Sequence, residues 1–469
     1  MLRERFASPR PAPSTAEHDP SVTVVEAPVA PSRPVAPEAP ALPPALVQVK
    51  ERVHRQLIEE LDQDRLGRLS AAEARAEVRR ATHEIVEGYP LQGAGELRQA
   101  LVEEIIDDVL GLGPLEPLLR DDSVSEIMVN GPDQVWVERN GRLQRSVQAF
   151  RDEAHLMRVV ERIVAPLGRR VDEASPMADA RLPDGSRVNI VVPPASPSGA
   201  KITLRKFARQ RLLSADLVRI GTLSEAAEAF LRGCVRAELN ILVSGGTGTG
   251  KTTLLNVLSS YIDAHERIVT IEDPLELQLQ QPHVVSLEAR PPGLEGNRQI
   301  SQRDLLRNAL RMRPDRVIVG EVRGGEAFDM LQAMNTGHDG SISTVHANTP
   351  RDAVSRVENM VLMAGLDLPD HAIREQIASA IQLIVQVSRL PDGSRRVSHI
   401  TEVAGMEGQM ITLQDLFVMV VDGEDAEGRL TSTLMPTGLQ PRFIERFERV
   451  GIPFPAESLR VDRVHGGSW

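Results

Sequence analysis

The chain has 469 residues, a formal net charge of −12 and a single cysteine, Cys234. The length predicts two to four domains, while one cysteine excludes an intramolecular disulfide and a cysteine-based zinc module. We therefore expect no zinc. Because the acidic charge repels phosphate backbones, we also expect no direct nucleic-acid binding.

Residues 1–44 are rich in Pro, Ala and Ser and poor in large apolar side chains. Such a segment cannot bury enough surface to offset its ordering entropy, so we expect a disordered tail. No apolar run follows the basic residues near the start, and no stretch of about 18 apolar residues could span a bilayer. We therefore expect a cytoplasmic protein whose membrane role goes through a partner.

A small helical module is predicted for residues 45–111. Apolar residues recur at helical spacing from Leu46 to Leu61. Ser70 with Glu73 forms a capping box that opens a second helix. The apolar spacing at residues 97–105 indicates a third helix.

An α+β domain is predicted for residues 112–208. Apolar and polar residues alternate on both sides of the pair Asn140-Gly141, which predicts a β-hairpin. A helical segment at 153–167 and strand-like runs at 187–194 and 201–207 follow.

After a polar linker at residues 209–221, an α/β domain is predicted for residues 222–425. Its candidate strands are apolar without alternation, which indicates burial on both faces and a parallel sheet. They are residues 240–244, 267–271, 316–320, 341–345 and 383–387. We expect a hairpin at Asp392-Gly393 to form the far edge of this sheet, and residues 426–469 to be a loosely organised extension.

A glycine-rich loop follows the first of these strands. Residues 245–252 read GGTGTGKT and match G-x-x-x-x-G-K-[ST] between a strand and a helix. Glycines let backbone N–H groups turn inward around a phosphate chain, and the helix N-terminus adds positive potential. We expect Lys251 to supply a point charge and Thr252 to bind Mg²⁺. The predicted nucleotide-binding residues are Gly246, Thr247, Gly248, Thr249, Gly250, Lys251, Thr252 and Thr253.

The sequence also favours one nucleotide. It contains no Asn-Lys-x-Asp guanine-reading motif, so ATP is favoured over GTP. It contains no Leu-Ser-Gly-Gly-Gln signature either, which argues against a transporter ATPase.

Hydrolysis needs a group that activates water and groups that neutralise charge on the γ-phosphoryl group. The segment TIEDPLE places Glu272, Asp273 and Glu276 at a strand end, where they are either catalytic or a solvated turn. Glu321 lies at the end of another strand. The residue before it, Gly320, stands where most P-loop enzymes have Asp.

Each of the other candidates also has two interpretations. Glu321 either holds Mg²⁺ through water or pairs with a neighbouring arginine such as Arg323. His338 and His346 flank a third strand. A lone strand histidine is usually structural, and His346 is either structural or touches the nucleotide.

Together these motifs resemble one family. The segments GGTGTGKTT, TIEDPLE, RMRPDRVIVGEVRGGEA and TGHDGSISTVHAN follow the order of Walker loop, Asp box, atypical Walker B and His box in secretion-superfamily ATPases, which drive type II secretion, type IV pili and type IV secretion. The segments DARLPDGSRVNIVVPP, ITLRKF, NALRMRPDR and LQAMNTGHDGS look most like the CpaF/TadA branch, which powers Flp/Tad pilus assembly. The resemblance covers about residues 95–405.

The resemblance implies an α+β (PAS-like) domain joined to a RecA-like P-loop ATPase domain, assembled as a homo-hexamer with ATP and Mg²⁺ at the domain junction. By matching motif, Glu276 is the water-activating base, Glu321 the Walker B carboxylate and His346 the His-box residue near the γ-phosphate. Arginines of the α+β domain are also implied to reach the γ-phosphate. The matching candidates are Arg181, Arg187 and Arg205.

The resemblance implies an ATP-hydrolysing motor, peripherally associated with the inner membrane, that transmits domain motion to a platform protein during Flp/Tad pilus assembly. Members of the pilus-extension and type II secretion branches usually carry a tetracysteine zinc module, which a single cysteine excludes. This favours the Flp/Tad and type IV secretion branches, so a type IV secretion traffic ATPase is the alternative. A nucleic-acid motor is disfavoured by the charge and the scarcity of aromatic residues. A basic stripe, Arg303, Arg307 and Arg311, either pairs with a neighbouring subunit or is a solvated face.

Overall fold

The computed structural model describes residues 44–60, 69–89, 95–139, 141–168, 170–207, 212–290, 299–424 and 430–461. The described residues form two compact units, one within residues 1–113 together with 146–149, and the other within residues 114–145 and 150–469. The predicted disordered tail lies outside the described residues, apart from its last residue. Among the described helices, none combines the length and apolar character needed to cross a bilayer.

The first unit contains three described helices, α1 (Pro44–Glu60), α3 (Ala71–Glu87) and α4 (Gly95–Leu110). They bury apolar residues against one another, among them Val53, Leu57 and Leu101. The predicted capping box is confirmed at the start of α3, where the side chain of Ser70 accepts from the backbone N–H of Glu73 and the Glu73 carboxylate accepts from that of Ser70.

The second unit begins with α5 (Leu115–Arg120) and an antiparallel sheet in the order β3-β2-β1-β6-β5-β4. Its strands are β1 (Val124–Val129), β2 (Val135–Arg139), β3 (Arg142–Arg145), β4 (Met177–Arg181), β5 (Arg187–Val191) and β6 (Lys201–Arg205). The predicted hairpin is confirmed by the pairing of β2 with β3, although Asn140 lies outside the described residues. Helix α6 (Glu153–Val164), which runs into η1 (Ala165–Leu167), buries an apolar face.

The second sheet has nine strands in the order β15-β14-β13-β12-β7-β11-β10-β8-β9. The five predicted buried strands form as β7 (Ile241–Gly245), β8 (Ile268–Glu272), β10 (Arg316–Val322), β11 (Ile342–Val345) and β12 (Leu383–Arg389). These strands and β9 (Val284–Glu288) pair in parallel, as predicted, whereas β13 (Arg395–Glu407) pairs antiparallel to β12. The fold is therefore α/β with a mixed sheet.

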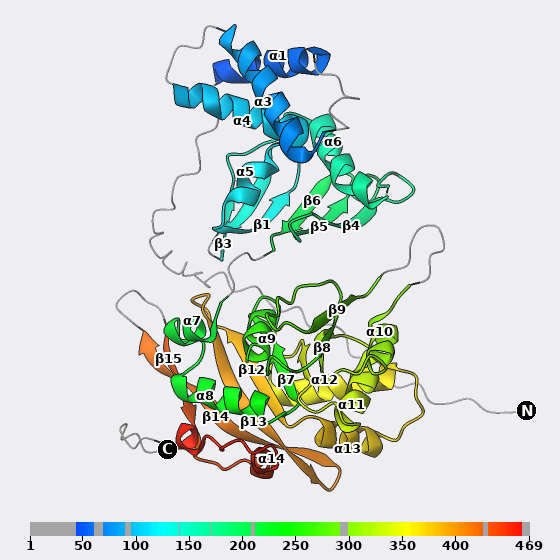
Figure 1. Ribbon diagram of the computed structural model, residues 1–469, viewed down its shortest axis with the longest axis vertical. Helices are drawn as coiled ribbons and strands as arrows, with labels where there is room; N and C mark the ends of the chain where they lie inside the picture. The colour runs from blue at the N-terminus through cyan, green and yellow to red at the C-terminus, as the bar shows by residue number, and fades with distance from the viewer. Residues whose placement is uncertain are drawn as a thin grey trace, which may run out of the picture. The chain divides into compact units, whose positions relative to one another are not determined.

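Helices cover both faces of this sheet (Figure 1). Along β7, Ile241 and Val243 pack into the cluster that contains α8 (Glu225–Arg236) and α9 (Lys251–Ser259), while Leu242 packs into the opposite cluster. The opposite cluster contains α10 (Gln302–Ala309), α11 (Glu326–Asn335), α12 (Pro350–Met363) and α13 (Asp370–Ala380). Burial on both faces explains why the strands are apolar without alternation.

Two predictions about the end of the chain are wrong. The Asp392-Gly393 hairpin is not the edge of the sheet, because β14 (Met410–Glu424) and β15 (Leu430–Pro436) add beyond β13. Residues 430–459 are not a loose extension either, since α14 (Ile444–Arg449) and η2 (Ala456–Leu459) follow β15, with Phe443 and Phe447 in the core. The buried Glu402 accepts a hydrogen bond from the backbone N–H of Arg442 at 2.6 Å and so anchors this segment.

The predicted arginine stripe on α10 finds a partner within the chain. Arg303 and Arg307 each lie 2.8 Å from a different oxygen of Asp329 on α11. Both oxygens of the Asp329 carboxylate therefore contact guanidinium groups of its own chain, and Arg303 and Arg307 tie α10 to α11, whereas Arg311 donates to the carbonyl oxygen of Arg307.

Candidate functional site

The predicted phosphate-binding loop joins β7 to α9 and depends on its glycines. Gly248 (φ 70°) and Gly250 (φ 99°) have left-handed backbone conformations, which residues with side chains rarely adopt. A Cβ atom on Gly245 would lie 2.6 Å from the carbonyl oxygen of Val387 on β12. The loop can therefore pack against the sheet only because these positions are glycine.

Lys251 is folded back onto this loop. Its Nζ donates to the carbonyl oxygens of Gly245 and Gly246, both at 3.0 Å. Burial lowers the pKa of Lys251, while the nearby Glu321 carboxylate acts in the opposite direction. An anion bound in the loop would further favour the charged ammonium group.

A cleft of about 1170 Å³ opens over the loop. Most of the predicted site residues line this cleft: Arg187, Arg205, Thr247, Gly248, Thr249, Gly250, Lys251, Thr252, Thr253, Glu276, Glu321 and His346. The structure thus brings together residues that lie up to 159 positions apart in the chain. Arg181 and Gly246, also predicted, do not line it.

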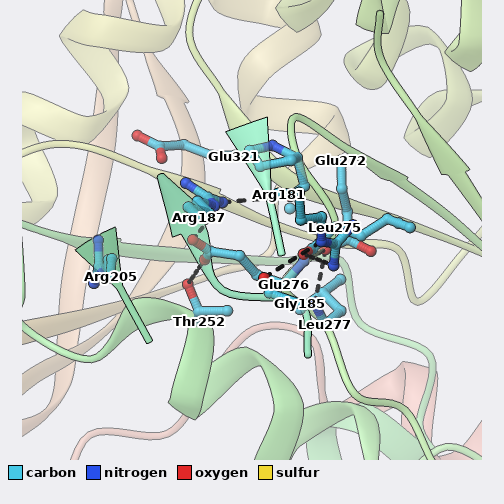
Figure 2. Close-up of polar contacts among 12 residues, drawn as sticks. Arg181, Gly185, Arg187, Arg205, Thr252, Glu272, Leu275, Glu276, Leu277 and Glu321 are labelled. Atoms are coloured by element: carbon cyan, nitrogen blue, oxygen red, sulfur yellow. Dashed lines mark hydrogen bonds and ion pairs between the residues drawn. The ribbon is translucent and has the colours of Figure 1, made fainter. Parts of the chain in front are cut away.

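Glu276 occupies the centre of a polar cluster (Figure 2). Its Oε2 accepts a hydrogen bond from the Thr252 hydroxyl at 3.1 Å, and its Oε1 forms an ion pair with Arg187. Arg187 also lies 3.5 Å from the carbonyl oxygen of Pro274 in the same segment. A carboxylate, a hydroxyl and a guanidinium group therefore converge beside the first turn of α9.

The other two carboxylates of the TIEDPLE segment lie in different surroundings. Glu272 is 1% exposed, so it is neither part of a solvated turn nor open to the cleft. Asp273 is exposed and does not line the cleft. Of the three, only Glu276 is placed to meet a ligand above the loop.

The three predicted arginines form one row across the first sheet. Arg181 on β4 pairs with Arg187 on β5, which pairs with Arg205 on β6. The row continues to Glu126 on β1, whose Oε1 lies 3.7 Å from Arg205. Like charges directly opposite one another are unfavourable in a sheet, so this row favours binding of an anion.

The neighbouring arginines of the row also affect the pKa of Arg187. Burial is the main cause that lowers its pKa; Glu276 opposes this, and Arg205, Arg323 and Arg181 lower it further. Arg181 is turned away from the cleft, and its guanidinium contacts Glu288 at 3.4 Å and the carbonyl oxygen of Leu275 at 3.0 Å. Arg187 is consequently the arginine of the row that contacts Glu276.

Glu321 and His346 approach the loop from β10 and from the end of β11. Glu321 forms an ion pair with Arg323 at 3.0 Å, which is the second of its two predicted interpretations. Burial and the Lys251 charge lower the pKa of His346 below its ordinary value of 6.5, which favours the neutral ring at pH 7. His338 does not line the cleft, and its Nδ1 is buried without a hydrogen-bond partner among the described residues.

Sequence reasoning missed two residues that shape the site. Arg395 donates from Nε to the carbonyl oxygen of Gly248 at 2.9 Å and lines the cleft. Asn256 on α9 accepts from the backbone N–H of Gln278 at 2.9 Å. Arg395 follows the predicted Asp392-Gly393 turn, but no local pattern indicated that this turn lies beside the glycine loop.

A second cavity of about 640 Å³ also adjoins the glycine loop. Thr249, Gly250 and Arg395 line both spaces. Its apolar wall comes from Leu212, Leu217, Ile220, Leu254, Val387 and Leu430, and α7 (Ser214–Arg219) contributes Leu217. Polar groups at its rim include Asp392 and Ser394.

The oxygen atoms near the loop suit a hard cation. The Thr252 hydroxyl and the Glu276 carboxylate are in direct contact, and Glu321 lines the same cleft. Mg²⁺ prefers oxygen ligands of this kind together with substrate phosphates. The residues present therefore fit the predicted metal.

Comparison with known proteins gives consistent matches. The family model described as "Type II/IV secretion system protein" matches residues 108–415. A putative conjugal transfer protein of Mycobacterium tuberculosis is 40% identical over 309 residues, which are 65% of this chain and 87% of that protein. The type IV secretion system protein PtlH of Bordetella pertussis is 38% identical over 312 residues, 61% of this chain and 91% of that protein.

Solved structures include a similar chain as well. The VirB11 ATPase from the Brucella suis type IV secretion system, in complex with sulphate, is 30% identical, with a TM-score of 0.34. The match covers 62% of this chain and 95% of that one.

Proposed function

Because the chain belongs to the type II/IV secretion system protein family, we propose that it is an ATPase motor of a secretion or pilus-assembly machine. The observation that carries this proposal is the position of the Glu276 carboxylate. It contacts both the Thr252 hydroxyl beside the glycine loop and the Arg187 guanidinium group. A base, a metal-binding hydroxyl and a charge-neutralising group thus meet where a γ-phosphate would lie.

The glycine loop binds the triphosphate. Backbone N–H groups of residues 246–253 and the N-terminus of α9 face the phosphate oxygens, and Lys251 exchanges its two carbonyl contacts for the β- and γ-phosphates. An ammonium group held by two neutral carbonyls gains more from an anion, which makes this exchange favourable.

Hydrolysis transfers the γ-phosphoryl group to water. Glu276 accepts a proton as the water oxygen bonds to the γ-phosphorus, and the bond from that phosphorus to the bridging oxygen breaks to release ADP. Arg187 and Lys251 neutralise the charge on the equatorial and bridging oxygens. His346, neutral at pH 7, donates a hydrogen bond to the γ-phosphate.

Thr252, with Glu321 acting through water, would hold Mg²⁺ at this site. The metal, when bound, supplies charge neutralisation between the β- and γ-phosphates. Arg205 lines the cleft beside Arg187 and adds positive charge near the phosphates, while Arg181 adds its charge from outside the cleft.

The cavity of about 640 Å³ is assigned to the nucleoside. It adjoins Gly250 at the end of the glycine loop, and its walls are apolar with a few polar groups, which suits a purine base. The absence of a guanine-reading motif supports ATP as the substrate.

We also propose the architecture that the resemblance implied. A PAS-like α+β domain (112–208) and a RecA-like domain follow a helical module (45–111), with a linker at 209–221. The RecA-like domain begins at residue 222 and continues past the predicted boundary at 425 to include β15, α14 and η2, which share its sheet and core. A homo-hexamer forms with the site at the junction of the two larger domains. Closure around ATP and opening after hydrolysis move an inner-membrane platform protein, and the motor works at the cytoplasmic face of that membrane.

The motifs shared with the CpaF/TadA branch support Flp/Tad pilus assembly as the process. The alternative is a type IV secretion traffic ATPase, which the similarity to PtlH supports. The two differ in the machine that the motor drives. If the chain serves pilus assembly, its loss should abolish pili. If it serves type IV secretion, its loss should abolish secretion of protein or DNA and leave pili in place.

The first test is ATPase activity per subunit against protein concentration, with Mg²⁺ and no nucleic acid, alongside sizing at each dilution. A rate that rises steeply and saturates as hexamers form is expected, with Lys251→Ala inactive throughout. A rate stimulated strongly by single-stranded DNA or RNA would favour a nucleic-acid motor. Binding of ATP without turnover at any concentration would contradict an ATPase.

A further inference from the structure

Gly320 lies in the interior of β10, where a glycine weakens a strand and often marks the close approach of another group. The register places Val319 beside Ile271 of β8, one residue before Gly320 and Glu272 respectively. A Cβ atom on Gly320 would lie 3.1 Å from Cγ and 3.6 Å from Cβ of Glu272. The space next to Gly320 is therefore filled by the Glu272 side chain.

The Glu272 carboxylate is buried and hydrogen-bonded to backbone. Its Oε2 accepts from the N–H groups of Glu276, at 2.6 Å, and of Leu277, at 2.7 Å. Its Oε1 accepts from the hydroxyl of Thr270 at 3.1 Å. Two of the three bonds thus reach the residue that carries the proposed base and its neighbour.

The segment that follows β8 has no helix or ladder bonds of its own from residue 273 to 278. Side chains from other elements accept its N–H groups instead: Glu288 accepts from Leu275 at 3.3 Å, and Asn256 accepts from Gln278 at 2.9 Å. Between these two anchors, Glu272 holds residues 276 and 277. Glu272 is the only buried carboxylate among these described anchors, since Glu288 is exposed.

We propose that Glu272 is a positioning residue that fixes the backbone of Glu276, and that position 320 is glycine because the Glu272 side chain occupies the space above it. The proposal rests on the proposed function, since it concerns the aim of the Glu276 carboxylate at the γ-phosphate. Glu272 touches neither the cleft nor the substrate, so it acts only through Glu276.

A purely structural role is the competing explanation. Burying a carboxylate is costly unless it is well hydrogen-bonded, and burial raises the pKa of Glu272 against the opposing effect of its backbone donors. If Glu272 only filled space beside Gly320, an apolar filler would replace it without loss of turnover. The packing contact with Gly320 allows these two roles to be separated.

The experiment compares wild type, Glu272→Gln, Glu272→Ala, Gly320→Ala and the double variant Glu272→Ala/Gly320→Ala. Three quantities are measured for each: kcat, the Kd for a fluorescent ATP analogue, and the melting temperature. Gly320 has no left-handed backbone, so alanine there adds bulk without backbone strain.

We expect Glu272→Ala to lower kcat about 10- to 100-fold, because a displacement of a reacting group by about 1 Å has this effect, with Kd unchanged within about twofold. Glu272→Gln keeps one acceptor oxygen and the fold, so its kcat should lie between those of wild type and Glu272→Ala. Gly320→Ala alone should lower kcat by displacing Glu272. In the double variant the new methyl group fills the space left by the carboxylate, so the melting temperature recovers while kcat stays low.

Recovery of kcat together with the melting temperature in the double variant would overturn the proposal, as would wild-type kcat in Glu272→Ala or Glu272→Gln. A kcat unchanged in Gly320→Ala would overturn the packing part. No hydrolysis by wild type, or full activity of Glu276→Gln, would instead remove the proposed function, and the positioning role with it.

Discussion

Two loops at the carboxyl edge of the nine-stranded sheet are held in different ways. The loop at residues 245–250 takes its shape from its own backbone, with left-handed glycines at 248 and 250 and contact with the β12 carbonyl at Gly245. The segment at residues 273–278 has no such glycines, and its N–H groups are accepted by Glu272, Glu288 and Asn256.

The difference follows from what each loop presents. The first offers backbone N–H groups to phosphate, so any side chain at the glycines would obstruct it. The second offers one side chain, Glu276, which must be aimed, so its backbone is held from behind by other elements. Under the proposed function, nucleotide binding therefore depends on local geometry, and hydrolysis depends on long-range contacts.

The largest expected effect comes from the first loop. Lys251→Ala should reduce ATP turnover below detection, because the phosphates lose their point charge. Turnover is measured by phosphate release. The matched control is Lys201→Ala on β6, whose Nζ donates to the carbonyl of Asn130 outside the cleft and whose loss should leave the rate unchanged. Measurable turnover in Lys251→Ala would contradict the proposed phosphate site.

Substitution of Arg187 tests the contact between the first sheet and the second loop, residues 273–278. Arg187→Ala should lower kcat about 10³-fold, the lower end of the range for arginine fingers, and Arg187→Lys should not restore it, since lysine lacks the planar fork. Arg181→Ala, which removes contacts to Glu288 and Leu275, should have a smaller effect. An equal loss in both variants would mean that the row acts only through its total charge.

Glu276→Gln tests the second loop itself. The amide keeps the size of the side chain but cannot accept a proton from water, so kcat should fall at least about 100-fold with ATP binding retained. Binding is followed with a fluorescent analogue, and Asp273→Asn, on an exposed neighbour, serves as the control. Near-normal turnover in Glu276→Gln would remove this residue from the role of base.

Adjacent glycines test the backbone of the first loop. Gly245→Ala forces a Cβ atom to 2.6 Å from the Val387 carbonyl oxygen, whereas in Gly246→Ala the nearest atom lies at 3.6 Å. The first variant should lower the free energy of unfolding by about 1–3 kcal/mol through overpacking, and the second by clearly less. Chemical denaturation measures both, and equal losses would show that the loop yields at Gly245.

The smallest expected effect is a pH dependence at His346, whose pKa is lowered by burial and by Lys251 of the first loop. A depressed histidine pKa means that the unfolded state binds the proton more readily, so stability is lost as the pH falls through and below 6.5. The stability advantage of wild type over His346→Gln should therefore shrink from pH 8 to pH 6. It should shrink less in the Lys251→Ala background; an equal change there would remove Lys251 as a cause.

The same contrast explains what could be predicted from the sequence. The buried strands, the glycine loop, the β2–β3 hairpin and the Ser70 capping box each have a local pattern, and each is confirmed as a structural element. Strands β14 and β15 were not predicted, because the end of the chain packs through contacts such as Glu402 with Arg442, 40 residues apart. The burial of Glu272 and the position of Arg395 depend on equally distant neighbours.

The candidate site was predictable to a similar degree. Motif order indicated Glu276, Glu321, His346 and the three arginines, and the structure places five of these six in one cleft. Their chemical roles stay predictions, because the pattern of a motif gives residue types and not the atoms that they touch. The choice of Arg187 over Arg181 needed the sheet register and the side-chain contacts.

The single cysteine makes labelling of this chain straightforward. Cys234 is fully buried in α8, and burial raises the pKa of its thiol well above the ordinary value, so it is unreactive while the protein is folded. A cysteine introduced at an exposed residue, such as Met177 on β4 or Met363 on α12, would then be the reactive thiol of the described structure. Paired fluorophores at such positions could follow the motion of the two sheets during turnover without removal of the native cysteine, and reaction of Cys234 itself would report opening of the core.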